Sequence, residues 1–516
     1  MIRTFSEITS DVVEEADVCI IGSGAGGAVM AKELAEKGHT VVVLEEGGNF
    51  VTADFNRNGV DMIRKLYRAK GLIFTRGLPH IALPLGRCVG GTTTINSGTC
   101  FRTPDGVLNN WEASHQVKDC SPVTMRPYFE RVEQALNVQE VSPEQMGRYA
   151  AIIRRGADRL GYEVKPLRRN VRGCQGSGVC AFGCPIGAKQ SMNVSYLPRA
   201  CQSGARIYAN CQATEILTEL MKSPSTRHRR RAACGVSGIV LNPQNESATF
   251  NIVVRAKVVV VAAGAVHTPA LLLKNRLCLD SGQVGKNLRI HPTARITALF
   301  DEPIEGWNEV PQSCYIDRFA AEGITLEGMF VPPEIAAFGL PHFGEPHKSL
   351  MKHYRNMASF GVRVSDSSAG DVRLGLGGSP NIHYPLNRDD AQKLIKGIAI
   401  TAEIFLAAGA KKIFTPVYQY SEMSSNADVA RLSRAKIRVS DLVGLAAFHP
   451  LGTCRMGSVR EKSVVDSNGE THDVENLFIS DASIFPTALG VNPQISIMAF
   501  STKTAEVIRA RLAGPA

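Results

Sequence analysis

A glycine-rich turn near the amino terminus constrains the fold of this chain more than any other feature. Residues 22–27 read Gly-Ser-Gly-Ala-Gly-Gly, which fits the pattern G-x-G-x-x-G. An apolar strand is predicted before the turn at 17–21 and a helix after it at 28–37, and a second strand follows at 40–44. Strand, glycine turn, helix and strand in this order are typical of the first βαβ unit of a dinucleotide-binding domain. We therefore expect a Rossmann-like α/β domain.

Each glycine of the pattern has an expected role in holding a dinucleotide. Gly22 permits the tight turn, Gly24 lets the backbone approach the pyrophosphate, and Gly27 lets the helix pack on the sheet. The free N–H groups of the helix N-terminus then face the phosphates. Glu45 follows the second strand, where its carboxylate would accept hydrogen bonds from the adenosine ribose hydroxyls. A cofactor with a 2′-phosphate is therefore disfavoured, but the turn alone does not separate NAD from FAD.

Two further apolar strands continue this sheet later in the chain. They are predicted at 257–261 and 477–479, and helices follow them from about 268 and from 494. The nucleotide-binding domain is thus assembled from separated stretches, and the Pro-, Gly- and His-rich segments between them form a substrate-facing domain. The predicted ranges are 1–110, 200–300 and 445–516 for the nucleotide-binding domain, and 111–199 and 301–444 for the substrate domain, which includes a cysteine-rich loop at 174–184.

Charge and hydropathy exclude several classes of protein. The formal net charge is +10, and the densest basic run, 227–231, is interpreted as a solvated hairpin tip because no nucleic-acid recognition module is present. The amino-terminal residues lack the pattern of a secretory signal, and no apolar window is long enough for a membrane span. We expect a cytoplasmic protein that binds no nucleic acid. A peripheral contact with a membrane or an electron-transfer subunit, and export with a partner, stay open.

Four further motifs carry a family resemblance. Residues 86–96 read GRCVGGTTTIN, 448–457 read FHPLGTCRMG, 481–487 read DASIFPT and 490–493 read GVNP. In this order and spacing they resemble the glucose–methanol–choline oxidoreductases, which are FAD enzymes. Within that family, the GVNP ending and residues 183–190 are most similar to the long-chain (fatty) alcohol oxidases, and then to the cholesterol oxidases. The resemblance covers the whole chain and implies a Rossmann-like FAD-binding domain with an α+β substrate domain that contains an antiparallel sheet.

The resemblance also implies which residues hold the FAD. Ile95 occupies the position of a histidine that is bonded covalently to the flavin in some members of the family. Isoleucine cannot form that bond, so we expect non-covalent FAD. Together with the first glycine turn, the expected FAD-binding residues are Gly22, Gly24, Gly27, Glu45, Gly91, Thr92, Asn96, Ala213, Asp481, Ala482 and Pro493.

His449 and Asn492 are the expected catalytic residues. Hydride leaves an alcohol carbon readily only as the hydroxyl proton is lost, so a base must lie within hydrogen-bond reach of that oxygen. By the family pattern His449 is this base, and the partner position holds Asn492, whose NH₂ group can hold the alcohol oxygen but cannot take the proton. His291 is expected to pack or to position a ring, and neither Glu327 nor Glu334 is assigned a role.

The cysteines leave a second interpretation open. The chain has thirteen of them, expected mostly as free thiols, and Cys174, Cys180 and Cys184 fall within one glycine-rich loop. Three thiols on such a loop could hold an iron–sulfur centre, as in related bacterial FAD-dependent glucose dehydrogenases, where three cysteines hold a [3Fe-4S] cluster. Zinc and unliganded thiols are the other interpretations. With a cluster, electrons would leave the flavin through it, and without one O₂ or another external acceptor would take them.

The sequence therefore predicts FAD-dependent oxidation of an alcohol to an aldehyde or ketone. The aromatic and Pro-rich stretch 330–346 would form an apolar wall of the substrate pocket, which favours a lipophilic, long-chain or sterol-like substrate. Three alternatives stay open: an FAD/iron–sulfur alcohol or sugar dehydrogenase, a non-catalytic or redox-carrier subunit with the same fold, and a lyase that uses FAD as a scaffold. The presence of His449 and Asn492 argues against the second of these.

Overall fold

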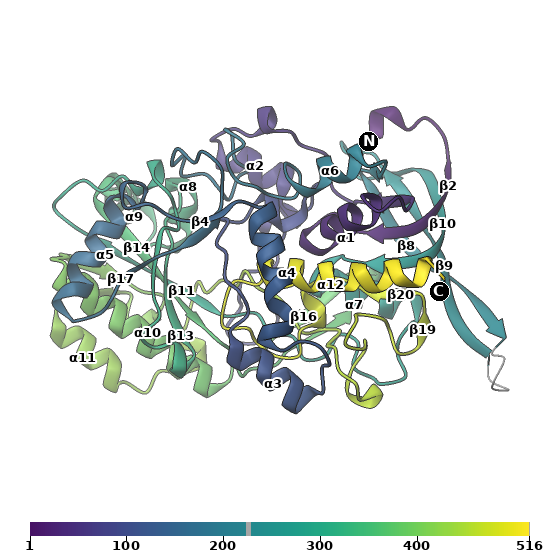
Figure 1. Cartoon of the computed structure of the whole chain (residues 1–516). Helices are drawn as coiled ribbons and strands as arrows, with labels where there is room; N and C mark the ends of the chain where they lie inside the picture. Colours follow the sequence, from purple (N-terminus) through teal and green to yellow (C-terminus); the bar gives the residue numbers. More distant parts are fainter. Residues whose placement is uncertain (223–228, 515–516) are drawn as a thin grey trace.

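Two β-sheets at opposite ends of the molecule organise the chain (Figure 1). The computed structural model describes residues 1–222 and 229–514, so the predicted hairpin tip, with part of the basic run 227–231, lies outside the described residues. Within those residues the larger sheet has nine strands and the smaller one seven.

The centre of the larger sheet is parallel. β2 (Val12–Ile21) pairs in parallel with β3 (Val41–Leu44) and β10 (Ala248–Val261), and β20 (Leu477–Ile479) pairs in parallel with β10. The last four residues of β2 and of β10 are buried, as expected for parallel strands covered on both faces. The remaining strands of this sheet are β1 (Ile2–Arg3), β7 (Arg206–Tyr208), β8 (Cys211–Lys222), β9 (Arg229–Leu241) and β19 (Val474–Glu475).

Three helices belong to this sheet, and two of them begin earlier than predicted. α1 (Ala25–Ala35) includes the last glycines of the turn, and α12 (Gln494–Leu512) packs against it (Figure 1). α7 (Gly264–Asn275) begins at Gly264, so Pro269 lies inside it. Proline cannot donate the helical hydrogen bond to the Ala265 carbonyl, and the Thr453 hydroxyl donates to that carbonyl instead, at 2.7 Å. A contact from far along the chain therefore allows the longer helix.

The smaller sheet is antiparallel and lies against helices of its own. β14 (Met357–Val364) is buried at every residue and pairs with β11 (Thr293–Leu299) and β13 (Ile324–Gly328), and α10 (Arg388–Ala407) packs on it. α5 (Gly147–Arg159) and α11 (Asn426–Arg434) pack on α10. In spatial order the strands are β18 (Glu422–Met423), β17 (Lys412–Phe414), β11 (Thr293–Leu299), β14, β13 (Ile324–Gly328), β12 (Cys314–Ile316) and β5 (Lys165–Pro166).

The strands and helices divide between the two cores slightly differently from the predicted ranges. β11 lies in the smaller sheet although its residues fall within 200–300, and α4 (Pro122–Ala135) packs on α12, in the core of the larger sheet, although it falls within 111–199. The other helices and strands are α2 (Gly59–Leu66), α3 (Asp105–His115), α6 (Tyr196–Gln202), α8 (Pro333–Ala336), α9 (Gly344–Lys352), β4 (Val138–Glu140), β6 (Arg168–Asn170), β15 (Asp371–Leu374) and β16 (Pro380–His383).

None of the helices in the described part of the chain combines the length and the apolar composition that crossing a membrane requires.

Candidate active site

One large cavity is lined by residues of both sheets. It has a volume of about 1740 Å³ and reaches from the first glycine turn to strands β13 and β14 of the smaller sheet. Pockets for a single small ligand usually measure roughly 300 to 1,000 Å³. The cavity therefore has room for a dinucleotide and for a second molecule beside it. Its two ends, called here the nucleotide end and the reaction end, are built differently.

The first glycine turn forms the floor of the nucleotide end. A Cβ atom on Gly27 would lie 1.9 Å from the Gly22 carbonyl oxygen, and one on Gly26 would lie 1.6 Å from the Ser480 carbonyl oxygen, so neither position accepts a side chain. A Cβ on Gly24, by contrast, would meet no atom within 4 Å. Gly24 is the N-cap of α1 and lines the cavity, so the open space beside it faces free N–H groups. This cradle fits the pyrophosphate of a dinucleotide.

Ser23 connects the first glycine turn to the second. Its hydroxyl donates to Glu45 Oε2 at 2.7 Å and accepts from the Gly90 N–H at 3.0 Å. Glu45 also accepts from the Ser23 N–H and, through its other oxygen, from the Gly47 N–H. Burial raises the pKa of Glu45 in spite of these bonds. The carboxylate lies in the cavity wall, and its contact with a ribose stays a prediction.

The second glycine turn lies directly on the first. A Cβ on Gly91, which has φ +54°, would lie 2.9 Å from the Gly24 Cα. Asn96 donates to Gln494 Oε1 at 2.9 Å and accepts from the Gly98 N–H at 3.0 Å, so its amide is fixed in the cavity wall. Thr92, Ile95, Ala213, Ala482 and Pro493 also line the cavity.

Asp481 lies in the same wall but turns toward the protein. Its carboxylate accepts from the Gly264 N–H at 2.9 Å, from the Thr268 hydroxyl and from the Ser483 N–H at 2.8 Å. The first two bonds join this carboxylate to the first turns of α7. Asp481 therefore anchors the N-terminus of α7 beside the cavity.

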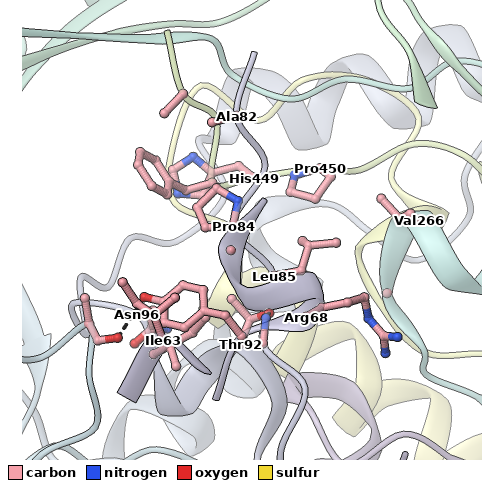
Figure 2. Close-up of a pocket in the computed structure, with 18 of the residues that line it drawn as sticks. Ile63, Arg68, Ala82, Pro84, Leu85, Thr92, Asn96, Val266, His449 and Pro450 are labelled. Carbon is pink, nitrogen blue, oxygen red and sulfur yellow. Dashed lines mark hydrogen bonds between the residues drawn. The ribbon is translucent and has the colours of Figure 1, made fainter. Parts of the chain in front are cut away.

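His449 lies at the reaction end. Figure 2 shows it with Pro450 on one side of the cavity, and Thr92 and Asn96 on the other. Its Nδ1 atom is buried and has no hydrogen-bond partner within the described residues. Burial, reinforced by His291 and Arg363, holds the pKa of His449 well below its usual value. The imidazole is therefore neutral and can take a proton.

Asn492 is oriented by a buried ion pair. Arg363 Nη1 donates to Glu327 Oε2 at 2.6 Å and also to Asn492 Oδ1. The Asn492 amide nitrogen donates to Glu327 Oε1 at 3.3 Å. Because Arg363 has no acceptor, the amide oxygen must face it, and the NH₂ group keeps one N–H for another partner. All three side chains are at least nine-tenths buried and line the cavity.

His291 supports the turn that carries Asn492. Its Nε2 atom accepts from the N–H groups of Leu489 and Gly490, both at 3.1 Å, so this nitrogen carries no proton. Burial lowers the pKa of His291 to about 3. Its ring centroid lies 5.4 Å from that of His449. His291 thus contacts both the base and the turn, which agrees with a positioning role.

The two glutamates left unassigned by the sequence lie in different places. Glu327, on β13, belongs to the buried network at the reaction end. Glu334, on α8, accepts from the Gly59 N–H at 3.1 Å and joins α8 to α2. Sequence reasoning missed Arg363 altogether. The available signal was a single charged residue in the otherwise apolar and small-residue strand 357–364.

The structure gives no support to the iron–sulfur and zinc interpretations of the cysteine loop. Cys174 and Cys180 both contact the buried guanidinium of Arg169, with N–S distances of 3.8 and 3.2 Å. Across the described residues, no three His, Cys, Asp or Glu side chains are grouped so that they could hold a metal ion.

The loop instead supports the second glycine turn. The buried Lys189 amine donates to the carbonyls of Thr94 and Cys180, both at 2.8 Å, and to that of Asn96 at 2.5 Å. Arg169 donates to the Ser97 carbonyl at 2.8 and 3.0 Å. Burial lowers the pKa of Lys189 to about 8. Two buried side chains thus hold segment 94–97 against the loop.

A parallel sheet with a dinucleotide-binding turn, joined across one cavity to an antiparallel sheet, is the arrangement expected of a flavoprotein oxidoreductase. The comparisons with known proteins agree. Two models described as GMC oxidoreductase match residues 63–293 and 365–501, and one described as an NAD(P)-binding Rossmann-like domain matches residues 20–64. The chain belongs to the GMC oxidoreductase family, whose members bind FAD.

Several curated proteins resemble the chain over nearly its full length. An uncharacterised GMC-type oxidoreductase of Mycobacterium tuberculosis is 35% identical, over 98% of this chain and 77% of that protein. A second one, from Sinorhizobium fredii, is 34% identical over 97% of this chain and 95% of that protein. Long-chain-alcohol oxidase FAO4B of Arabidopsis thaliana is 28% identical over 93% of this chain and 65% of that protein.

Solved structures show the same fold at low sequence identity. Pyridoxine 4-oxidase from Mesorbium loti superposes with a TM-score of 0.69 and 16% identity, over 96% of this chain and 99% of that one. A formate oxidase superposes with a TM-score of 0.70 and 15% identity, over 98% and 99%. The predicted fold class, an FAD-binding domain with a parallel sheet plus a substrate domain with an antiparallel sheet, is confirmed.

Proposed function

We propose that this protein oxidises a lipophilic alcohol, long-chain or sterol-like, to an aldehyde or ketone by hydride transfer to non-covalent FAD. The observation that carries the proposal is the pairing of a neutral base, His449, with an oriented amide, Asn492, in one cavity with both glycine turns. Bound FAD supplies a two-electron acceptor at its ring. The protein supplies the base, the hydrogen bond that holds the alcohol, and a site shielded from water.

The residues at the reaction end divide the chemistry. His449 takes the hydroxyl proton, for which its lowered pKa keeps the imidazole free. The N–H of Asn492 that does not face Glu327 donates to the alcohol oxygen, and Arg363 keeps the amide from flipping. As the O–H bond breaks, the C–H bond gives up its hydrogen with both electrons. The alcohol thus loses one proton and one hydride and becomes a carbonyl compound.

The proposed FAD-binding residues are those expected from the sequence, and their contacts in the structure assign each a more specific role. Gly22 and Gly24 would form the pyrophosphate cradle, and Gly91, Thr92 and Asn96 would hold the flavin half. Gly27 does not line the cavity and acts instead by letting α1 pack closely on the turn. Glu45, Ala213, Asp481, Ala482 and Pro493 complete the wall. Ile95 cannot bond to the flavin, so acid precipitation should leave all the flavin in the supernatant. Flavin that stays with the pellet would contradict non-covalent binding.

Two observations support a lipophilic substrate. The wall of the cavity beyond the reaction end is apolar, with Met329, Phe330, Ile335 and Leu340 among its residues. The 28%-identical relative in Arabidopsis thaliana is named for its action on long-chain alcohols. The electron acceptor in this proposal is O₂ or an external carrier. The iron–sulfur dehydrogenase alternative is not carried forward, because no three metal-binding side chains are grouped together among the described residues.

The proposal is tested by anaerobic titration of the holoprotein with primary alcohols of increasing chain length and with a sterol. We expect the visible flavin absorbance to bleach, with one carbonyl product formed for each flavin reduced and with tighter binding for longer chains. Admission of air to the reduced protein then shows whether O₂ is the acceptor. Failure of every alcohol to bleach the flavin would overturn the proposal, and product without net oxidation would instead indicate a lyase.

A further inference from the structure

Large apolar side chains stand exposed around the mouth of the cavity. Phe338 and Phe343 are 89% and 90% exposed, and Leu72, Phe74 and Tyr418 are each more than half exposed, although all five line the cavity. We call these five residues the apolar rim. A soluble surface carries single exposed apolar residues without consequence, but a cluster around one opening indicates an interaction site.

The segments that carry the rim touch one another around the opening. Phe74 forms a bridge with Ala82, and Ala82 forms one with Ala446. The Val443 N–H donates to the carbonyl of Pro416, which lies two residues before Tyr418 in the sequence. His342, next to Phe343, pairs with Glu422 on β18, which follows Tyr418 in the sequence. The exposed side chains therefore belong to one continuous border.

Positive charge without partners lies along the same border. Arg64 and Lys70 line the cavity mouth beside Leu72, and Arg76 follows Phe74; all three are exposed. Within the described residues, none of these three side chains has an ion-pair or hydrogen-bond partner, whereas Lys65 is paired with Asp61. The formal net charge of the whole chain is +10. The border thus combines aromatic and aliphatic side chains with free cations, as peripheral membrane-binding surfaces do.

We propose that the apolar rim inserts into the surface of an anionic lipid membrane, from which the alcohol enters the cavity directly. This inference rests on the proposed function, because a lipophilic alcohol dissolves mainly in the bilayer. A second copy of the chain seated on the rim would close the opening to the substrate. At a membrane surface the alcohol can pass from the acyl chains into the cavity without first entering water.

The test is flotation of the holoprotein with vesicles of phosphatidylcholine alone and of phosphatidylcholine with phosphatidylglycerol. We expect binding mainly to the anionic vesicles. The double variant Phe338→Ser/Phe343→Ser should bind about tenfold more weakly or worse, since each phenylalanine loses most of its transfer into the interface. Arg64→Gln/Lys70→Gln should lose the preference for phosphatidylglycerol, about fivefold for each charge.

A matched control comes from two valines exposed elsewhere. Val13 and Val123 are 75% and 74% exposed, lie on β2 and α4, and do not line the cavity. Val13→Ser/Val123→Ser should bind vesicles as the unmodified protein does. FAD content and the thermal unfolding midpoint show that each variant is folded.

Three results would overturn membrane docking: no binding of the unmodified protein to either vesicle, equal loss in the valine control, or a dimer in sedimentation that the double phenylalanine variant abolishes. Other results would contradict only one of the two proposals, either the alcohol oxidation or the membrane docking. Vesicle binding without oxidation of any alcohol would support membrane docking by the apolar rim and contradict alcohol oxidation. Oxidation of alcohols in solution without vesicle binding would support alcohol oxidation and contradict membrane docking.

Discussion

The nucleotide end and the reaction end of the cavity are built by different means. At the nucleotide end, two glycine turns pack backbone to backbone, and Gly91 has no room for a side chain against Gly24. At the reaction end, side chains from four distant segments meet: Glu327, Arg363, His449 and Asn492. A backbone cradle depends on which residues lack a side chain, whereas the reaction end depends on which side chains orient one another. Substitutions should therefore disturb one end and spare the other.

The largest expected effect is on catalysis at the reaction end. His449→Gln keeps a polar side chain of similar size but removes the base. The rate of flavin reduction by alcohol should fall about a thousandfold, within the usual range for loss of a general base. FAD content should be unchanged because the glycine turns are untouched. Anaerobic stopped-flow measurement and flavin extraction test both statements, and a loss of FAD in this variant would show that the two ends are not independent.

Removal of Arg363 should have the next largest effect, this time on stability. Arg363→Met leaves the carboxylate of Glu327 buried without its partner, which costs about 3 kcal/mol in the free energy of unfolding. The amide of Asn492 also becomes free to flip. Adding Glu327→Gln to Arg363→Met should restore much of the stability, since no buried charge remains. Urea unfolding of the unmodified protein and the two variants measures this, and a double variant no more stable than Arg363→Met would contradict the role of the ion pair.

The nucleotide end is tested by a matched pair of glycine substitutions. Gly27→Ala places a Cβ against the Gly22 carbonyl and should cost about 2 kcal/mol of stability, because the helix must shift from the sheet. Gly24→Ala meets no protein atom, so stability should be retained, while FAD binding weakens because the methyl group fills the cradle. Urea unfolding of the apoprotein and FAD titration separate the two effects. Equal affinity for FAD in Gly24→Ala would place the pyrophosphate elsewhere.

The smallest expected effect is on pH dependence. A solvated imidazole loses half of its basic form at about pH 6.5. Because burial holds the pKa of His449 well below its usual value, the neutral base persists as the pH falls, and the rate declines only at lower pH. The limiting rate of flavin reduction should therefore be nearly the same at about pH 8 and about pH 6.5, where a solvated base would have lost half its activity. A midpoint at or above about pH 6.5 would contradict the buried, neutral base.

The same contrast explains what could be predicted from the sequence. The turn at Gly22–Gly27 was predictable because a backbone requirement leaves a local pattern, and the family resemblance located His449 and Asn492. Neither revealed Ser23 as the link between the turns, nor Arg363 as the group that orients the amide. Hydrogen bonds between residues 67 and 129 positions apart leave no spacing to detect. Nor did the sequence reveal Arg169 and Lys189 as the buried partners of the cysteine loop, because single cations beside a loop form no motif.

Hydride transfer from an alcohol to the flavin should show a primary isotope effect. Single-turnover flavin reduction is measured anaerobically with a long-chain primary alcohol and with the same alcohol dideuterated at the carbon that bears the hydroxyl. We expect the alcohol to reduce the flavin, deuteration to slow this reduction severalfold, and His449→Gln to be slow with both alcohols. Flavin that stays oxidised with saturating alcohol would contradict hydride transfer from an alcohol.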